Sequence, residues 1–163
     1  MITIRPAAGA DVPVLREIAV AAYERYVPLI GRAPAPMTAD YAAAVQAGQA
    51  WLAAGADGAA LGLIVLIPQS GFLLLENVAV VPAAQGRGVG ARLLAFAEEQ
   101  ARALGLAEIR LYTNEAMTAN LAYYPRHGYT ETHRAQEDGF RRVFFAKRLT
   151  RPGEGETRTG RGR

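Results

Sequence analysis

The stretch "PAAQGRGVGARLL", residues 82–94, places three glycines within five positions and then continues into a predicted helix. An apolar strand-like run, "FLLLENVAVVP", residues 72–82, leads into it. At a helix N-terminus the first backbone N–H groups lack an intrahelical acceptor and carry the positive end of the helix dipole. Glycines let an anion come close to these groups, so the loop is typical of a phosphate-binding site.

Two common phosphate motifs fit this loop poorly. No Gly-Lys-Ser/Thr follows the glycines, which excludes a P-loop. A dinucleotide fingerprint, G-x-G-x-x-A, is met by Gly86, Gly88 and Ala91, and Glu108 lies about 20 residues farther on. That fingerprint follows the first strand of a βαβ unit, and its acid ends the second strand. Here several strand-like runs precede the loop and Glu108 begins its strand, which argues against a nicotinamide-dependent oxidoreductase.

The composition predicts one globular domain, residues 1–150. Of the 163 residues, 51% are apolar and 20% are charged. We expect a cytoplasmic protein without a membrane partner, because no apolar run approaches the roughly 18 residues of a membrane span and no secretory signal is visible. Cysteine is absent and serine occurs once, at Ser70, so no covalent acyl-enzyme is expected. The two histidines, His127 and His133, predict no metal site.

The net charge of +3 comes mainly from residues 151–163, "RPGEGETRTGRGR". This segment holds four arginines and two glutamates and has no aliphatic residue, which predicts a disordered basic tail. Four dispersed arginines without aromatic residues are not typical of a nucleic-acid site, so no nucleic-acid partner is expected. The alternative, binding through the tail, predicts a salt-sensitive association that deletion after Thr150 abolishes.

The N-terminal third predicts a strand followed by two helices. Residues 2–7, "ITIRPA", alternate as a strand, and residues 10–26 show helical apolar spacing with Asp11 as the expected N-cap. Thr38 is the expected cap of a short helix that Gly48 ends. Three β-rich runs separated by short glycine turns come next and predict antiparallel neighbours: residues 50–54, 60–68 and 72–82.

The C-terminal half predicts a long helix, a strand, a short helix and a final hairpin. Apolar spacing defines the long helix from Gly88 to Leu104. The remaining elements are a strand at 107–113, a helix at 117–124 cut by Pro125, and strands at 129–135 and 141–149 joined by "QEDG". The expected fold class is α/β (α+β), a mixed and mostly antiparallel sheet flanked by helices in the order βααβββαβαββ.

The loop also meets a third pattern, Gln/Arg-x-x-Gly-x-Gly/Ala, through Gln85, Gly88 and Gly90. With "NVAVVPAAQGRGVGARLL" around this loop, "IRPA" near the start and "NLAYYPRHGY" at 120–129, the chain resembles the GNAT superfamily of acyl-coenzyme A N-acetyltransferases. The likeness covers roughly residues 2 to 149 in element order. It implies a transferase that moves the acetyl group of acetyl-CoA to a primary amine by direct attack in a ternary complex. A non-catalytic acyl-CoA sensor or scaffold is the alternative.

The resemblance also implies which residues hold the coenzyme. The strand before the loop splays from its neighbour in this family, so that its main chain pairs with pantetheine, and an N–H near Val80 faces the thioester oxygen. The loop amides hold the pyrophosphate. The implied cofactor-binding residues are Val78, Ala79, Val80, Gln85, Gly86, Arg87, Gly88, Val89 and Gly90.

Two residues are expected to be catalytic. Tyr124 matches the tyrosine that commonly protonates the departing coenzyme A thiolate, with Tyr123 as its neighbouring competitor and a core tyrosine as the alternative reading. Glu76 interrupts an apolar strand and is expected to share a face with Val78 and Val80, where it could act as the base. A surface carboxylate paired with an arginine is the alternative for Glu76.

The rest of the expected site is less closely specified. The family often carries an asparagine seven residues before the tyrosine, but Met117 stands there, so Asn114 or Asn120 is expected to reach pantetheine. The acceptor pocket is expected from the first two helices and the proline loop, where Tyr23, Tyr26 and Tyr41 cluster, with core aromatics as the alternative reading. No acidic run lies there, so strongly cationic acceptors such as polyamines are not specifically indicated. A small-molecule or peptide amine is the expected partner, and the protein is expected to be a monomer or a homodimer.

Overall fold

The computed structural model of this chain describes residues 1–150, and the predicted tail, 151–163, lies outside this range. One mixed sheet of seven strands has the order β1-β2-β3-β4-β5-β7-β6, and only the β4–β5 pair is parallel. The strands are β1 (Thr3–Pro6), β2 (Ala50–Ala54), β3 (Ala60–Pro68), β4 (Leu73–Val80), β5 (Glu108–Asn114), β6 (Thr130–Glu137) and β7 (Phe140–Arg148).

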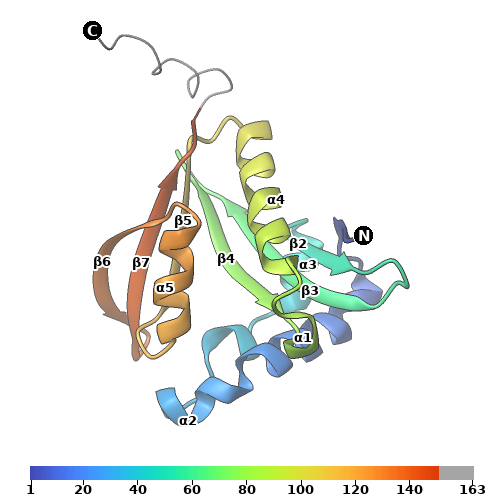
Figure 1. The fold of residues 1–163 in the computed structure, drawn as a ribbon, viewed down its shortest axis with the longest axis horizontal. Coiled ribbons are helices and arrows are strands. Elements are labelled where there is room, and N and C mark those ends of the chain that lie inside the picture. Colours follow the sequence, from blue (N-terminus) through green and yellow to red (C-terminus); the bar gives the residue numbers. More distant parts are fainter. Residues whose placement is uncertain (151–163) are drawn as a thin grey trace, which may run out of the picture.

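Helices cover both faces of this sheet (Figure 1). The helices are α1 (Val12–Tyr23), α2 (Val27–Ile30), α3 (Tyr41–Gln46), α4 (Val89–Ala103) and α5 (Thr118–Arg126). Two apolar clusters form the core, one between the sheet and α4 with α5, the other between the sheet and α1 with α3. The predicted order βααβββαβαββ is confirmed, with the one-turn α2 and short 3₁₀ turns added. Within residues 1–150 no helix is long and apolar enough to cross a bilayer.

Of the two predicted helix caps, Asp11 is confirmed at the N-cap position of α1 although its side chain does not cap the helix, and Thr38 is wrong. Asp11 stands before α1, but its carboxylate turns back to accept the Ala8 N–H at 2.7 Å and the Arg5 guanidinium at 2.7 Å. Thr38 lies too far ahead of α3 to reach its first turn. Asp40 caps α3 instead, because its carboxylate accepts the Ala43 N–H at 3.0 Å.

The C-terminal elements differ from prediction at two turns. Pro125 does not cut α5, which continues to Arg126, because a proline in the last turn removes only one late hydrogen bond; Gly128 then takes the left-handed conformation at φ 88°. The final hairpin turns through two residues, Asp138 (φ 53°) and Gly139 (φ 80°), instead of through all of "QEDG". Positive φ at both central residues matches the twist of the flanking strands.

Candidate active site

The sheet opens between β4 and β5. The parallel pairing of these strands is limited to Leu73 with Ile109 and Leu74 with Arg110, although β4 continues to Val80 and β5 to Asn114. Figure 1 shows the two strands diverging from their common end. A cavity of about 450 Å³ occupies the opening and is lined from both strands, from α1 and α5, and from the β6–β7 hairpin. Tyr124, Glu76, Val78, Asn114 and Asn120 all line it.

A β-bulge at Glu76 determines to which face of the sheet the polar side chains of β4 point. Val65 pairs with Asn77 and Leu66 with Leu75, so Glu76 is the extra residue and the alternation of side chains is interrupted there. Leu75 packs in the α4 cluster, whereas Asn77 contacts helices of the opposite face. The prediction that Glu76 shares a face with Val78 and Val80 is therefore wrong.

Glu76 instead faces the side of the cavity lined by β5 and β7. Its carboxylate accepts the Tyr112 hydroxyl at 3.3 Å. Asn77 is buried and lies on the same face, where its amide donates to the Tyr41 hydroxyl at 2.9 Å and its Oδ1 accepts the Tyr23 hydroxyl at 2.7 Å. The bulge thus turns two consecutive polar side chains toward one side of the opening.

The glycine loop presents a row of unpaired donors. Gly86 and Gly88 have φ values of 78° and 83°, and Gly88 precedes the first turn of α4. The Arg92 N–H is the first to reach a helical carbonyl, Gly88 O, at 3.0 Å. The N–H groups of the preceding turn, Val89, Gly90 and Ala91, therefore have no intrahelical acceptor. This geometry fits a pyrophosphate at the loop.

The main chain of β4 alternates between β3 and the opening. The Val81 N–H donates to Leu61 O of β3 at 3.0 Å, so in the same ladder Ala79 also turns its N–H and C=O toward β3. The main-chain groups of Val78 and Val80 then face the opening. Of the three residues expected to pair with pantetheine, Val78 and Val80 have the matching orientation and Ala79 does not.

The carbonyls of this open edge already have partners. The Tyr23 hydroxyl donates toward Val78 O at 2.9 Å, and Gln85 Nε2 donates to Val80 O at 3.2 Å. The N–H groups of Val78 and Val80 face a gap that no strand fills, because the β4–β5 pairing ends at Leu74. An unpaired N–H beside a cavity is the arrangement that stabilises a developing oxyanion.

Tyr123 and Tyr124 point to different places. Tyr124 is 7% exposed, packs against Tyr129 and Phe145, and lines the cavity. Burial raises the pKa of Tyr124 well above its ordinary value near 10, so its hydroxyl stays a hydrogen-bond donor at neutral pH. Tyr123 does not line this cavity; its hydroxyl lies over the first turn of α4, where a Cβ added to Gly90 would meet it at 2.8 Å.

Both candidate asparagines line the cavity and are held in place. Asn120 Nδ2 donates to Thr113 Oγ1 at 3.0 Å. Asn114 Oδ1 accepts the Ala116 N–H at 2.9 Å and shapes the turn after β5. Met117 is 4% exposed and contributes an apolar side chain to the wall between them.

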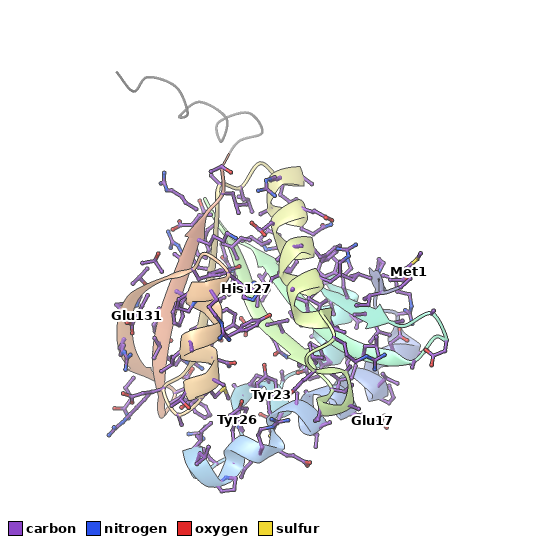
Figure 2. The ribbon with its side chains drawn as sticks, in the orientation of Figure 1. Met1, Glu17, Tyr23, Tyr26, His127 and Glu131 are labelled. Carbon is purple, nitrogen blue, oxygen red and sulfur yellow. The ribbon has the colours of Figure 1, made fainter. Side chains whose placement is uncertain are left out.

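Of the three tyrosines expected in the acceptor pocket, one lines the cavity, one supports its wall from behind and one does neither. Tyr23 lines the cavity together with the proline loop, residues 34–36. Tyr41 does not line it; it is 1% exposed, and its hydroxyl donates to Pro36 O and accepts from Asn77, so it supports the wall from behind. Tyr26 does not line it either. Figure 2 shows Tyr23 and Tyr26 below the diverging ends of β4 and β5.

The wall formed by β5 and the β6–β7 hairpin was not predicted from the sequence. Tyr112, Asp138, Phe140 and Arg142 line the cavity there. The Arg142 guanidinium lies 4.3 Å from the centre of the Tyr112 ring, and its side chain is only 10% exposed. An arginine inside the β-rich run "FRRVFF" was a usable signal, but assigning it to the site requires knowing that β7 lies beside β5.

Comparison with known proteins identifies the family of this chain. The sequence profile of the Acetyltransferase (GNAT) family matches residues 13–129. The chain belongs to the GNAT acetyltransferase family. The match includes β4, the glycine loop, α4 and Tyr124, the elements that surround the opening.

Solved GNAT structures share the fold over nearly the whole chain. The PaiA N-acetyltransferase of Thermoplasma acidophilum, solved in complex with coenzyme A, has a TM-score of 0.74 at 19% identity and covers 91% of this chain and 99% of its own. The ribosomal-protein-S18-alanine N-acetyltransferase of Escherichia coli has a TM-score of 0.71 at 20% identity and covers 94% and 97%. At these identities the likeness shows the fold alone.

A curated relative matches a shorter part of the chain. The aminoalkylphosphonate N-acetyltransferase of Salmonella typhimurium is 36% identical over 59 residues, which are 36% of this chain and 38% of the relative. The match therefore spans well under half the length of that relative.

Proposed function

We propose that this GNAT protein is an N-acetyltransferase that transfers the acetyl group of acetyl-CoA to a primary amine by direct attack in a ternary complex. The observation that carries the proposal is the opening between β4 and β5: a cavity lined by Tyr124 and Glu76 occupies it, and a loop of free N–H groups follows β4. Family membership and the coenzyme A complex of the PaiA relative support it.

The coenzyme fits the row of donors on the β4 side. We assign its pyrophosphate to the loop residues Gln85 to Gly90, where Arg87 adds a cationic rim. The N–H groups of Val78 and Val80 fit the amide-rich pantetheine arm, as an added strand would pair with an open sheet edge. Asn120 and Asn114 line the same opening and supply further polar contacts.

Glu76 is the proposed base. An alkyl ammonium has a pKa near 10.4, so only about one molecule in a few thousand is free amine at neutral pH. Glu76 lies in the cavity and accepts that proton directly or through a water molecule. As the amine nitrogen bonds to the acetyl carbon, the Val80 N–H stabilises the negative oxygen, and the carbon–sulfur bond then breaks.

Tyr124 is proposed to stabilise the departing thiolate by hydrogen bonding. Proton transfer from an ordinary phenol to an ordinary thiolate is uphill by about 2 kcal/mol. Burial raises the pKa of Tyr124 further, which makes full transfer less favourable and leaves the hydroxyl as a neutral donor. The acetylated amine and coenzyme A thiol are the products, with the proton balanced through Glu76 and solvent.

Substitution of the adjacent tyrosines tests the proposal. Thiol release from acetyl-CoA with an amine panel should give a kcat that falls on the order of 10²-fold in Tyr124→Phe, with coenzyme affinity kept. Tyr123→Phe is the matched control, and its kcat should stay within about threefold of the parent because its hydroxyl lies outside the cavity. Coenzyme binding without turnover on any amine would favour the sensor instead.

A further inference from the structure

The charges around the cavity define the acceptor more closely, if the proposed acetyl transfer is correct. The cavity is lined by three carboxylates, Asp40, Glu76 and Asp138, but by one guanidinium, Arg142. The chain as a whole carries +3, so this excess of negative charge is local. The carboxylates come from three separate segments and were not visible as an acidic run in the sequence.

Within residues 1–150, Arg142 is the only cation that lines the cavity, and it is already paired with carboxylates. Arg32 contacts Asp138 O and the Phe140 ring but does not line the cavity. Arg142 Nη1 lies 2.9 Å from Glu137 Oε2 and 3.7 Å from Asp138 Oδ2, and its guanidinium stacks on Tyr112. An acceptor with a phosphonate or carboxylate group would have to displace these partners from a side chain that is nine-tenths buried. Removing a buried charge from its partner is costly, so Arg142 acts as a wall and not as an anion receptor.

The acidic side chains are available to a cation. Glu76 accepts a hydrogen bond from Tyr112 but makes no ion pair with any side chain in residues 1–150. Asp40 caps α3 and likewise makes no ion pair in that range. Asp138 lies 3.7 Å from Arg142, which pairs more closely with Glu137, but its side chain is 83% exposed, so its carboxylate is still open to a second cation at the rim.

Apolar residues form part of the lining, among polar ones such as Asn77, Tyr112 and Thr113. Leu75, Val78, Leu111, Met117 and Phe140 line the cavity together with the prolines of residues 34–36. Such apolar side chains pack against methylene groups without leaving polar groups unpaired. A half-buried carboxylate on β4, two exposed carboxylates and a partly apolar lining match a chain with a cation at each end.

We propose that the acceptor is a linear aliphatic amine with two cationic groups. The reacting amine lies at Glu76, the methylene chain follows the apolar part of the lining, and the second ammonium lies at the rim near Asp40 and Asp138. This assignment departs from the aminoalkylphosphonate substrate class of the partial relative, because such a substrate carries an anionic end.

The test uses acceptors of equal length that differ at the far end. Full-length protein is assayed for thiol release from acetyl-CoA with 1,4-diaminobutane, n-butylamine, 4-aminobutanoate and 4-aminobutylphosphonate, with products identified by mass. We expect kcat/KM for diaminobutane to exceed that for either anionic amine at least tenfold. A preference for 4-aminobutanoate or 4-aminobutylphosphonate would overturn the inference.

Two isosteric variants locate the second ammonium. Asn retains both the helix cap at position 40 and the positive φ at position 138, so Asp40→Asn and Asp138→Asn preserve the backbone. Each should lower the diaminobutane-to-butylamine ratio of kcat/KM about threefold to tenfold, whereas Glu17→Gln on α1 should keep the parent ratio (Figure 2). An unchanged ratio in both variants would contradict the assignment.

The assay separates this inference from the proposed function. Turnover of butylamine or of an anionic amine, without a preference for the diamine, would overturn only the acceptor assignment. Coenzyme binding by calorimetry with no turnover on any amine would overturn the transferase proposal itself.

Discussion

At the scale of single residues, Gly90 shows how a coenzyme loop and a neighbouring tyrosine constrain each other. Gly90 is the second residue of α4, where glycine is intrinsically less favourable than alanine by about 1 kcal/mol. A Cβ at this position would lie 2.8 Å from the Tyr123 hydroxyl, however, which is closer than any real contact. An alanine at this position would therefore force the Tyr123 hydroxyl to shift.

We predict a coupled effect of substitutions at these positions. Gly90→Ala should lower the free energy of unfolding by about 1 kcal/mol through overpacking. In a Tyr123→Phe background the obstacle is gone, so the same change should be neutral or stabilising. Gly86→Ala is the control: it has open space but a φ of 78°, and should cost about 1 kcal/mol in both backgrounds. Denaturant titration of the parent, the three single variants and the two double variants measures the coupling. Strict additivity of Gly90→Ala and Tyr123→Phe would contradict the account.

At the scale of elements, Asp11 joins β1 to the start of α1. Its carboxylate accepts hydrogen bonds from Arg5 and from the Ala8 N–H, and these interactions lower its pKa to about 2. A carboxylate with a depressed pKa stabilises the fold at pH values above its unfolded pKa, near 3.9, and loses that contribution as the pH falls through its folded pKa.

Asp11→Ala should therefore lower stability by about 1 kcal/mol at pH 7, or about 3 °C in Tm. The difference from the parent should narrow as the pH falls from about 4 to about 2, since the parent carboxyl then becomes protonated. Thermal unfolding followed by circular dichroism at a series of pH values measures it. A difference that grows toward low pH would rule out this role, and Glu17→Ala on the exposed side of α1 serves as the control.

Elements that depend on local pattern could be predicted from the sequence. The glycine loop, α4 and the approximate strand positions follow from apolar spacing and turn residues within a short window. The bulge at Glu76 could not be predicted, because it is defined by pairing with Val65 and Leu66 of β3. Arg142 was missed for the same reason: its place in the site depends on β7 pairing with β5, far away in sequence.

At the scale of the whole molecule, Arg32 joins the segment after α2 to the β6–β7 turn. Its Nη1 donates to Asp138 O at 3.1 Å, and its guanidinium lies 3.9 Å from the centre of the Phe140 ring. Asp138 and Phe140 both line the acceptor cavity, so this contact joins two of its walls. The coenzyme loop lies elsewhere and does not depend on it.

Arg32→Ala should raise KM for the amine about fivefold, or about 1 kcal/mol in binding free energy, because the two cavity walls that this arginine joins lose their contact. The Kd for coenzyme A should stay unchanged. Arg25→Ala, an exposed arginine on the preceding turn, should change neither constant. Steady-state kinetics and calorimetry measure the two constants separately. Equal losses in amine KM and coenzyme Kd would show a general destabilisation instead of a local one.

The most direct test of the central claim is the initial-velocity pattern when acetyl-CoA and the amine are varied together. Direct attack within the opening between β4 and β5 predicts intersecting lines in double-reciprocal plots and no mass change in protein incubated with acetyl-CoA alone. Parallel lines, together with protein that gains the mass of one acetyl group, would show a covalent intermediate and contradict the account.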